Sequence, residues 1–391
     1  MKKQTKAIHT AYVHPDAYNA LNFPVYQSVS YEFADAQAMS DAFSGVSHEP
    51  NYSRTTNPTV THFEHKVREL ANAPHTTAFN SGMAAISNTL FALSAKGKTI
   101  VTTRHLFGNT FSLIVQTLGR FGVKVRLCDL TNKEAVEKAM DETVCCIFFE
   151  ILTNPQLEVA NIADLAAIAH SNNVPLVADS TMIPFTEINL GEQGVDIEVV
   201  SSTKYISGGA TSLGGLVIDY GTTKGFHERM TRELLYNLGA YMTPQVAYLQ
   251  TLGLETLKAR YAVHQQNALQ LAQRLQKLEG IEQVNYVGLE DNPYHELAKQ
   301  QFGPTAGAML TFDLKDRDAC FSFINRLKLI KRSTNLFDNR TLAIHPASTI
   351  FASFHEIMKK QMDVRETTIR LSIGLEDVDD LFEDIKQALE G

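Results

Sequence analysis

Lys204 and Asp179 are the residues whose types and positions most directly suggest chemistry. Each follows a short apolar run: Asp179 comes after residues 176–178, and Lys204 comes after the run 197–200. A lone lysine is usually a solvated surface residue, but a partly desolvated amine can form a Schiff base with an aldehyde. An aspartate at the end of a strand can cap a helix, bind a metal or pair with a cationic heterocycle, and capping is the commonest of these roles.

Residues that suit a phosphate group occur in two further segments. Ser201 and Thr203 precede Lys204, and the segment Ser81-Gly82-Met83 opens a predicted helix. Ser81 can cap that helix, Gly82 lets backbone N–H groups approach a ligand, and a helix N-terminus favours an anion. A capped helix without a ligand would have the same sequence. The glycine pattern is not GxGxxG, so a dinucleotide fingerprint is absent.

One cofactor needs all of these groups. Pyridoxal 5′-phosphate (PLP) requires a lysine for its aldehyde, a carboxylate for its pyridinium nitrogen and donors for its phosphate. Lys204, Asp179 and residues 81–83 can supply them from separate strand ends. We therefore predict that Lys204 carries PLP as a Schiff base and that the chain is a PLP-dependent enzyme.

The elements around these residues alternate between strands and helices. This order predicts an α/β fold with a mostly parallel sheet covered on both faces, in which ligands bind at the carboxyl ends of the strands. After Pro244 a long helix is expected to reach Glu279, followed by a smaller α+β region. The expected strands are 99–102, 124–127, 144–149, 175–178, 197–200, 215–218, 284–287 and 308–312, and the expected helices begin near 63, 110, 133, 162, 244, 319 and 377.

Three regions follow from this pattern. Residues 1–60 are rich in turn formers and aromatic residues and have little periodicity, so we expect an arm that contacts a partner subunit. Residues 61–245 are expected to form a large PLP-binding domain, and residues 246–391 a C-terminal domain.

The composition of the chain limits the kinds of binding partner and the cellular compartment that we expect for it. The chain has 391 residues, a net charge of −8 and no basic block, which disfavours nucleic acid or a membrane as an obligatory partner. Its four cysteines lack the spacing of a redox or metal motif, so no metal is expected. The N-terminus lacks the apolar segment of a signal peptide, and no run approaches membrane-spanning length. These features predict the reducing cytoplasm.

Six segments, in order along nearly the whole chain, resemble motifs of the Cys/Met-metabolism family of PLP enzymes. That family has the aspartate-aminotransferase-like fold, also called PLP fold type I. The segments are 52–58 (YSRTTNP), 81–85 (SGMAA), 150–155 (EILTNP), 179–181 (DST), 201–205 (SSTKY) and 370–376 (RLSIGLE).

The resemblance implies a role for each segment. Tyr52 and Arg54 would reach across a dimer interface to the phosphate of the neighbouring subunit, so the chain is expected to form at least a dimer, with a tetramer favoured. Asn154 would touch the phenolic oxygen of PLP, and Arg370 with Asn335 would bind the substrate carboxylate. The implied cofactor-binding residues are Tyr52, Arg54, Ser81, Gly82, Met83, Phe107, Asn154, Asp179, Ser201, Thr203 and Lys204.

Departures from the family patterns bear on the substrate. Phe107-Gly108 stands where many members have Tyr-Gly, so stacking on PLP remains but the phenolic hydroxyl is lost. Residues 335–349 (NLFDNRTLAIHPAST) resemble the sulfhydrylase pattern NLGDxRTLxIHPAST, with Phe337 in place of glycine. Cystathionine enzymes often have glutamates at the positions of Arg340 and Asn51. Phe337 could narrow the acyl or sulfide pocket.

We therefore predict γ-replacement on O-acetyl- or O-succinylhomoserine, a small amino-acid substrate. Sulfide or a small thiol would give homocysteine or methionine. Lys204 would move the Cα and Cβ protons while Asp179 holds the ring nitrogen protonated. The alternatives are a methionine or cystathionine γ-lyase, a cystathionine γ-synthase, and a non-catalytic PLP-binding protein.

Overall fold

A seven-stranded sheet forms the centre of the larger part of the molecule. The computed structural model describes residues 1–13 and 16–390. Five strands, β2 to β6, pair in parallel, whereas β7 is antiparallel to both β6 and β1. The order is β1-β7-β6-β5-β4-β2-β3, with bounds β1 His75–Phe79, β2 Thr99–Thr102, β3 Lys124–Leu127, β4 Val144–Glu150, β5 Leu176–Asp179, β6 Ile197–Val200 and β7 Gly215–Asp219.

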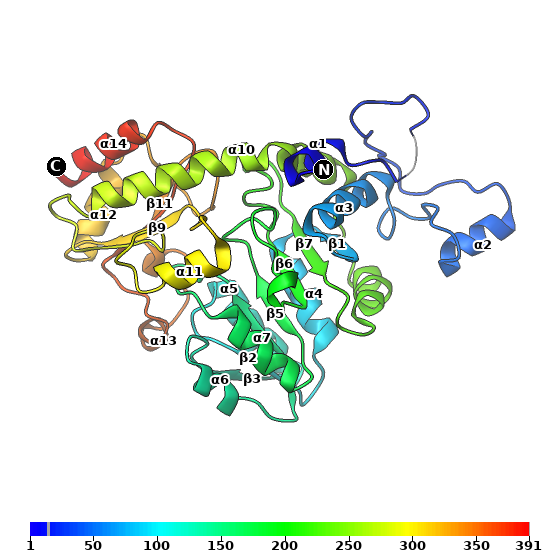
Figure 1. Ribbon diagram of the computed structural model, residues 1–391, viewed down its shortest axis with the longest axis horizontal. Coiled ribbons are helices and arrows are strands. Elements are labelled where there is room, and N and C mark those ends of the chain that lie inside the picture. The colour runs from blue at the N-terminus through cyan, green and yellow to red at the C-terminus, as the bar shows by residue number, and fades with distance from the viewer. Residues whose placement is uncertain (14–15, 391) are drawn as a thin grey trace.

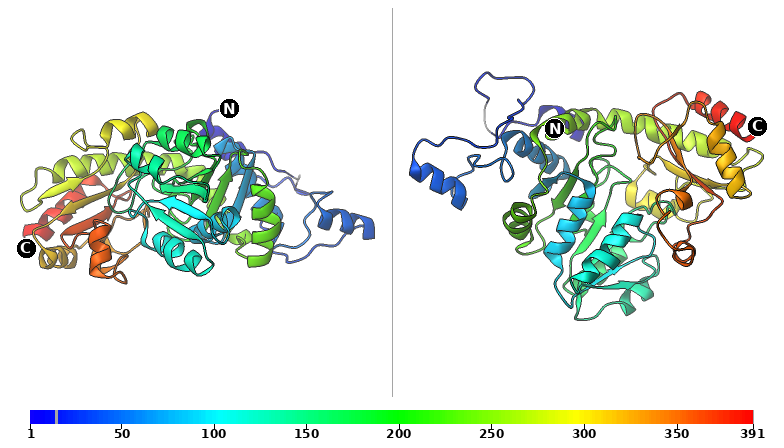
Figure 2. Two further views of the ribbon diagram at one scale, coloured as in Figure 1. Left: turned by 90° about the horizontal axis from the view of Figure 1, so that it is seen from below. Right: turned by 180° about the vertical axis from the view of Figure 1, so that it is seen from behind.

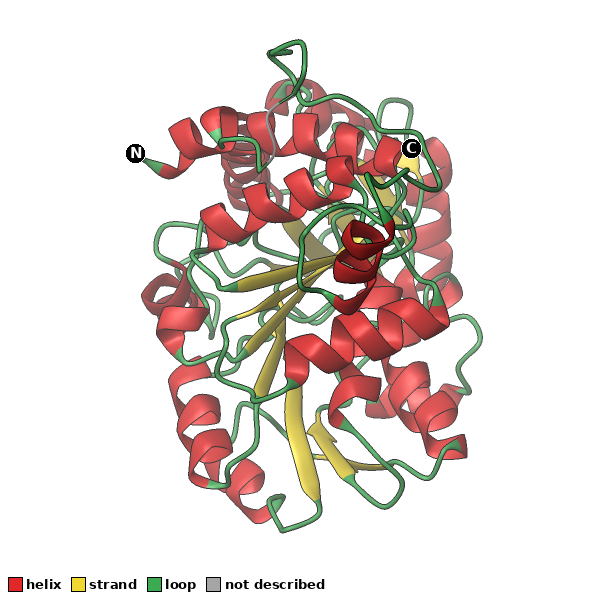
Figure 3. Ribbon diagram, turned by 90° about the vertical axis from the view of Figure 1, so that its right-hand side faces the viewer, coloured by secondary structure: helices red, strands yellow, loops and turns green. Residues whose placement is uncertain are grey.

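Helices cover both faces of this sheet, as Figure 3 shows. Alternate residues of β4 enter different cores: Ile147 and Phe149 lie in one apolar cluster, Cys146 and Phe148 in the other. A strand buried on both faces needs a continuous apolar run, and the segment VCCIFFE supplies one. The flanking helices are α3 Pro58–Ala71, α4 Gly82–Leu93, α5 Gly108–Ser112, α6 Lys133–Lys138 and α7 Ile162–Ser171.

A second sheet of five strands forms the smaller part. Its order is β10-β11-β12-β9-β8, with α12 and α14 packed together beside it. The helix α10 (Pro244–Leu275) runs along the molecule from the larger part to the smaller one (Figure 1). The remaining bounds are α8 Phe226–Glu228, α9 Tyr236–Leu238, β8 Gln283–Asn285, α11 His295–Phe302, β9 Met309–Asp313, α12 Arg317–Arg326, β10 Lys331–Arg332, β11 Leu342–Ile344, α13 Glu356–Gln361, β12 Thr368–Ser372 and α14 Val378–Glu390.

The N-terminal arm carries two helices that its sequence did not predict. α1 (Lys3–His9) packs on α3 and α10, whereas α2 (Ala36–Ser44) is held away from the rest of the chain (Figures 1 and 2). Apolar side chains of the arm face solvent in the single chain; Leu21 is 96% exposed and Val46 is 75% exposed. The arm contains many of the large apolar side chains that are exposed, which is typical of a region that contacts another chain.

Other differences from the sequence expectations are local. α10 ends at Leu275 rather than Glu279, and the helix expected near 110 consists of α5 followed by a π-helical segment, Leu113–Leu118. The strands β1, β10, β11 and β12 were not predicted; β10 and β11 have only two and three residues, which are too few to establish a period. In the described ranges, none of the helices has the length and apolar character needed to cross a membrane.

Candidate active site

A cavity of about 600 Å³ lies where the carboxyl ends of the parallel strands face the smaller sheet. Asp179 is the last residue of β5 and Glu150 the last of β4, and the two strands pair in register at this point. The smaller part of the molecule contributes Arg370 from β12 and Asn335 from a loop. The predicted residues that line the cavity are Ser81, Gly82, Met83, Phe107, Asn154, Asp179, Ser201, Thr203, Lys204, Asn335 and Arg370.

Lys204 has the environment of a reactive amine. Its Nζ donates to Asn335 Oδ1 at 2.9 Å. Burial, with the positive charge of Arg370, lowers the pKa of Lys204 to about 8, and the negative charge of Asp179 opposes this shift. A larger fraction of the amine is therefore deprotonated near neutral pH than in a solvent-exposed lysine, which favours attack on an aldehyde.

Asp179 serves both as a cap and as a buried carboxyl group. Its Oδ1 accepts from the backbone N–H of Thr181 at 2.9 Å, so the capping role considered from sequence is present. Burial raises the pKa of Asp179, and burial and the nearby Asp179 raise the pKa of Glu150 far above its usual range. A cationic ring nitrogen beside Asp179 would relieve the cost of burying its charge.

The expected phosphate site is a narrow turn between two segments. Ser81 Oγ caps α4 by accepting from Ala84 N at 3.1 Å. A Cβ at Gly82 would lie 2.7 Å from Ser201 Cβ, so a side chain at this position would close the turn. The free N–H groups at the start of α4 and the Ser201 hydroxyl, which is unpaired within the described ranges, are donors suited to an anion.

Thr203 differs from Ser201 in its hydrogen bonds. Its Oγ1 donates to Gly214 O at 3.1 Å and accepts from Gly214 N at 3.0 Å. Both capacities of this hydroxyl are therefore used within the chain, although Thr203 lines the cavity. A direct hydrogen bond from the Thr203 hydroxyl to a phosphate would require its hydrogen bond to Gly214 O to break.

Arg370 is positioned for an anionic group. Its Nη1 donates to Asn154 Oδ1 at 3.2 Å and its Nη2 to Thr334 O at 3.3 Å, while its buried Nε has no partner in the part of the chain that the structure describes. Burial lowers the pKa of Arg370 to about 9, which still leaves it charged at neutral pH. A carboxylate would supply the acceptor that the guanidinium lacks.

Phe107 is held by Glu150 through its backbone. The Phe107 N–H donates to Glu150 Oε1 at 2.6 Å, and the side chain lines the cavity. A Cβ at Gly108 would lie 3.0 Å from Ile350 O, which explains why a glycine follows the aromatic residue. The sequence indicated Glu150 only as the first residue of the segment 150–155, and its role in positioning Phe107 was not predicted.

Other residues of the cavity had weaker signals in the sequence. Thr181 Oγ1 accepts from Ser201 N at 2.8 Å and so ties two strand ends together. Its place in the segment DST was the only signal available. The unpredicted lining residues include Ile86, Met182, Leu213, Ser333, Thr334 and Ile350.

Phe337 corrects one expectation. It does not line the cavity but is fully buried and stacks on Tyr205, with ring centroids 3.8 Å apart and an interplanar angle of 6°. The suggestion that it narrows the acyl or sulfide pocket is therefore wrong. Arg340 also lies outside the cavity; it is largely exposed and pairs with Asp338.

Tyr52 and Arg54 do not line the cavity of their own chain. They lie in the arm, where Arg54 donates to the carbonyl of Tyr236 and its guanidinium lies 5.3 Å from the Tyr52 ring centroid. Asn51 accepts from the Tyr52 N–H and from the hydroxyls of Thr55 and Thr56, which shapes this segment. Their cross-subunit role remains a prediction.

Known proteins resemble the chain over its full length. The family sequence model described as "Cys/Met metabolism PLP-dependent enzyme" matches residues 4–390. O-acetyl-L-homoserine sulfhydrylase of Corynebacterium glutamicum is 31% identical, covering 98% of this chain and 95% of its own length. L-methionine gamma-lyase of Pseudomonas putida is 35% identical, with coverages of 98% and 96%. O-succinylhomoserine sulfhydrylase of Pseudomonas aeruginosa is 35% identical, with coverages of 93% and 90%.

A solved structure supports the same assignment. The crystal structure of a protein described as an O-acetylhomoserine (thiol)-lyase from Campylobacter jejuni superposes with a TM-score of 0.96 at 32% identity and covers 100% of both chains. That crystal structure contains N′-pyridoxyl-lysine-5′-monophosphate. The predicted fold class and cofactor are thereby confirmed. The chain belongs to the Cys/Met-metabolism family of PLP-dependent enzymes.

Proposed function

We propose that the chain catalyses γ-replacement on an O-acylhomoserine, with sulfide or a small thiol giving homocysteine or methionine. The observation that carries this proposal is the composition of the cavity wall. Its only carboxyl groups are Glu150 and Asp179, both at the expected cofactor, within the residues that the structure describes. Apart from Lys204, Arg370 and the carboxamides of Asn154 and Asn335, the wall offers apolar side chains and hydroxyls. They include Met182, Leu336 and Ser333. The acyl group of such an ester carries no ammonium charge, so it suits this wall better than the distal ammonium group of cystathionine.

The residues of the cavity have separate roles in the proposed reaction. Bound PLP supplies an electron sink for the negative charge that develops at Cα. Asp179 keeps the ring nitrogen protonated, and Arg370 holds the α-carboxylate so that the Cα–H bond stays aligned. Phe107 covers one face of the ring, while Ser81, Gly82 and Ser201 hold the phosphate. Tyr52 and Arg54 would come from a second copy of the chain.

Lys204 is the group that moves protons. Its lowered pKa makes the amine a base near neutral pH, and it lies on the cavity wall between Asp179 and Asn335. Because Phe107 has no hydroxyl, Lys204 is assigned the protons at both Cα and Cβ. We infer that the enzyme is a homo-oligomer, at least a dimer, and that it works in a reducing cytoplasm.

The methionine γ-lyase reaction is the second candidate, because relatives of that name are 35% identical over nearly the whole chain. Purified enzyme with PLP is assayed with O-acetyl- and O-succinylhomoserine plus sulfide, and separately with methionine or cystathionine alone. We expect homocysteine from one of the esters. If methionine alone yields ammonia and a 2-oxo acid at a higher kcat/KM than the ester reaction, the sulfhydrylase proposal is wrong.

A further inference from the structure

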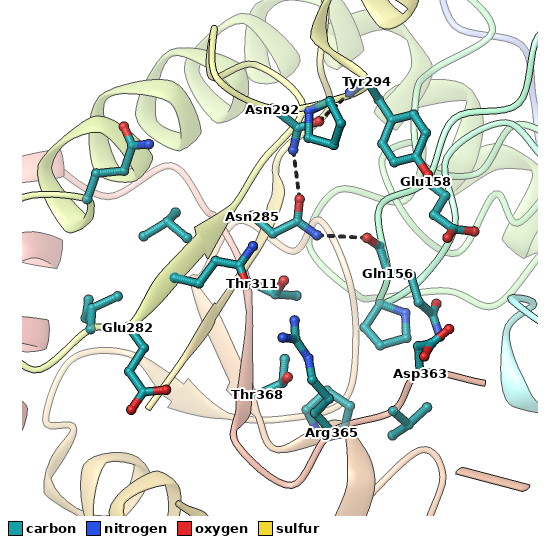
Figure 4. A pocket seen from close by; sticks show the side chains of 18 of the residues that line it. Gln156, Glu158, Glu282, Asn285, Asn292, Tyr294, Thr311, Asp363, Arg365 and Thr368 are labelled. Atoms are coloured by element: carbon teal, nitrogen blue, oxygen red, sulfur yellow. Dashed lines mark hydrogen bonds between the residues drawn. The ribbon is translucent and has the colours of Figure 1, made fainter. Parts of the chain in front are cut away.

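A second cavity of about 600 Å³ shares no lining residue with the cofactor cavity. Figure 4 shows it between the loop after Asn154 and the strands of the smaller sheet. One wall is formed by Gln156 and Glu158 of the large part, and the opposite wall by residues around β8. Thr311 of β9 and Thr368 of β12 lie between these walls. A volume of this size is typical of sites for small molecules.

The side chains that line this cavity carry more negative than positive charge, and the negative charges lie on two separate sides. Four carboxylates and one guanidinium line the cavity: Glu158, Glu282, Asp291, Asp363 and Arg365. Glu282 lies on one side, whereas Glu158 and Asp363 lie on the other (Figure 4). His105 contacts both members of the second pair, at 2.5 Å and 2.9 Å, and offsets part of their charge. A negative excess therefore remains at both ends of the cavity.

Arg365 projects between the two acidic sides (Figure 4). Its Nη1 pairs with Asp313 Oδ2 at 2.9 Å, while the side chain is 53% exposed. Its remaining N–H groups donate to no residue in the described ranges, so they are available to a carboxylate between the two acidic ends.

A hydroxyl of the cavity wall that has no hydrogen-bond partner is a second, independent feature that suits a ligand. Thr311 is 3% exposed, yet its Oγ1 forms no hydrogen bond within the ranges 1–13 and 16–390, and the residue lines the cavity. Near it, the carboxamides of Asn285 and Asn292 are fixed by a chain of hydrogen bonds, from Asn292 to Asn285 and from Asn285 to Gln156 O, each 2.8 Å long (Figure 4). The polar groups of this wall are therefore already oriented.

We propose that this cavity binds a basic α-amino acid, a small molecule with two ammonium groups and one carboxylate. One ammonium group would face Glu282, and the other would face Glu158 and Asp363. The carboxylate would lie on Arg365, and Thr311 Oγ1 would hydrogen bond to the ligand. A neutral amino acid lacks the second ammonium group, and a diamine lacks the carboxylate.

The test is calorimetric titration of the PLP-loaded enzyme with L-lysine, L-norleucine and cadaverine. We expect L-lysine to bind about tenfold or more tightly than either of the others, because each lacks one charged contact. The visible absorption of the cofactor is recorded in the same titrations, since an amino acid that enters the cofactor site changes that spectrum. Binding at the proposed cavity leaves the spectrum unchanged in position.

Substitutions locate the binding site. Glu282→Gln and the near-isosteric Thr311→Val should each weaken L-lysine binding about fivefold to tenfold. Glu383→Gln removes an exposed carboxylate on α14, outside the cavity, and serves as the matched control, with binding unchanged. The proposal is overturned if L-lysine binds no better than norleucine or cadaverine. It is equally overturned if both cavity variants bind L-lysine as the control does.

Discussion

At the scale of single residues, Lys204 is the group on which cofactor attachment and catalysis both depend. Lys204→Ala should abolish the visible absorption band of the bound cofactor and lower turnover by at least about a thousandfold, because the amine that bonds the aldehyde and moves the protons is gone. Spectra and initial rates are measured on the same preparation. Lys98→Ala, at an exposed position, is the control and should match the wild type. Turnover that survives in the Lys204 variant would contradict the assigned role.

The lowered pKa of Lys204 predicts how cofactor attachment depends on pH. Burial and Arg370 lower this pKa to about 8, so the reactive amine of the cofactor-free chain should form as the pH rises through about 8 rather than through 10.5. The rate at which the cofactor-free protein regains its absorption band with added PLP should follow this midpoint. Asp179→Asn removes the charge that raises the pKa of Lys204, so its midpoint should move to lower pH. A midpoint near 10 in the wild type would exclude the lowered pKa.

Two opposing effects determine how Phe337 changes the stability of the fold: strain in its backbone and packing of its ring. Its φ is 55°, a backbone conformation that costs a non-glycine residue about 1–2 kcal/mol, yet its ring is fully buried against Tyr205. Loss of a buried phenylalanine costs about 3–5 kcal/mol, so the packing effect is the larger one. Phe337→Gly should therefore destabilise the protein by about 2 kcal/mol, measured by chemical unfolding. A more stable variant would show that backbone strain dominates.

The residues that could be predicted from the sequence share one property. Asp179 ends β5 and Lys204 lies in the loop after β6, so the predicted order of strands and helices suffices to bring these two residues to one edge of a sheet. Ser81 was identified as a helix cap, without the strand β1 that precedes it. Phe337 could not be placed, because its position depends on a left-handed turn and on stacking with Tyr205. Glu150 was missed as a positioning residue because its contact is to the backbone of Phe107, 43 positions away.

At the scale of elements, His105 joins the loop after β2 to two other segments. Both of its ring nitrogens face carboxylates, Glu158 and Asp363. A neutral imidazole has one N–H and cannot donate to both, so the arrangement requires the protonated ring. Burial lowers the pKa of His105, but the hydrogen bond and charge of Glu158, with Asp363, outweigh this effect and raise it overall.

The sign of the resulting pH dependence follows from that raised pKa. A histidine whose pKa is higher in the folded state stabilises fully below its unfolded pKa of about 6.5, and this contribution is lost as the pH rises through the folded pKa. His105→Gln should therefore cost about 1–2 kcal/mol at pH 6 and clearly less at pH 9, measured by chemical unfolding. His9→Gln, at an exposed position, should show no such difference. A cost that is independent of pH would indicate that His105 is neutral in the folded protein.

The long elements were predictable and the short ones were not. β4 and α10 have enough residues to show an apolar pattern, and α10 begins at Pro244, where a long helix was expected. Thr243 caps this helix and Pro244 occupies its first turn. β10 and β11 have two and three residues, and their pairing is determined by the neighbouring strand β12. The second cavity was not predicted either, since its walls come from segments between Pro155 and Thr368.

At the scale of the whole molecule, the part of the N-terminal arm that contains α2 packs little against the rest of its own chain. α2 projects away from the rest of the molecule (Figure 2). The side chains of Leu21 and Val46 are exposed. Tyr52 and Arg54 lie at the base of this arm and outside the cavity of their own chain. If they complete the phosphate site of a second copy, each active site needs residues from two subunits.

Mixed oligomers test this arrangement directly. Lys204→Ala and Arg54→Ala subunits should each be nearly inactive alone. When the two are unfolded together and reassembled, a hybrid dimer has one site with both substitutions and one with neither. Random pairing should therefore restore about a quarter of wild-type activity if Arg54 acts across the interface. If Arg54 acts within its own subunit, every site in the hybrid carries one substitution and activity stays near zero. Lys204→Ala mixed with Asp179→Ala is the control: both residues line the cavity of one chain, so mixing should restore nothing.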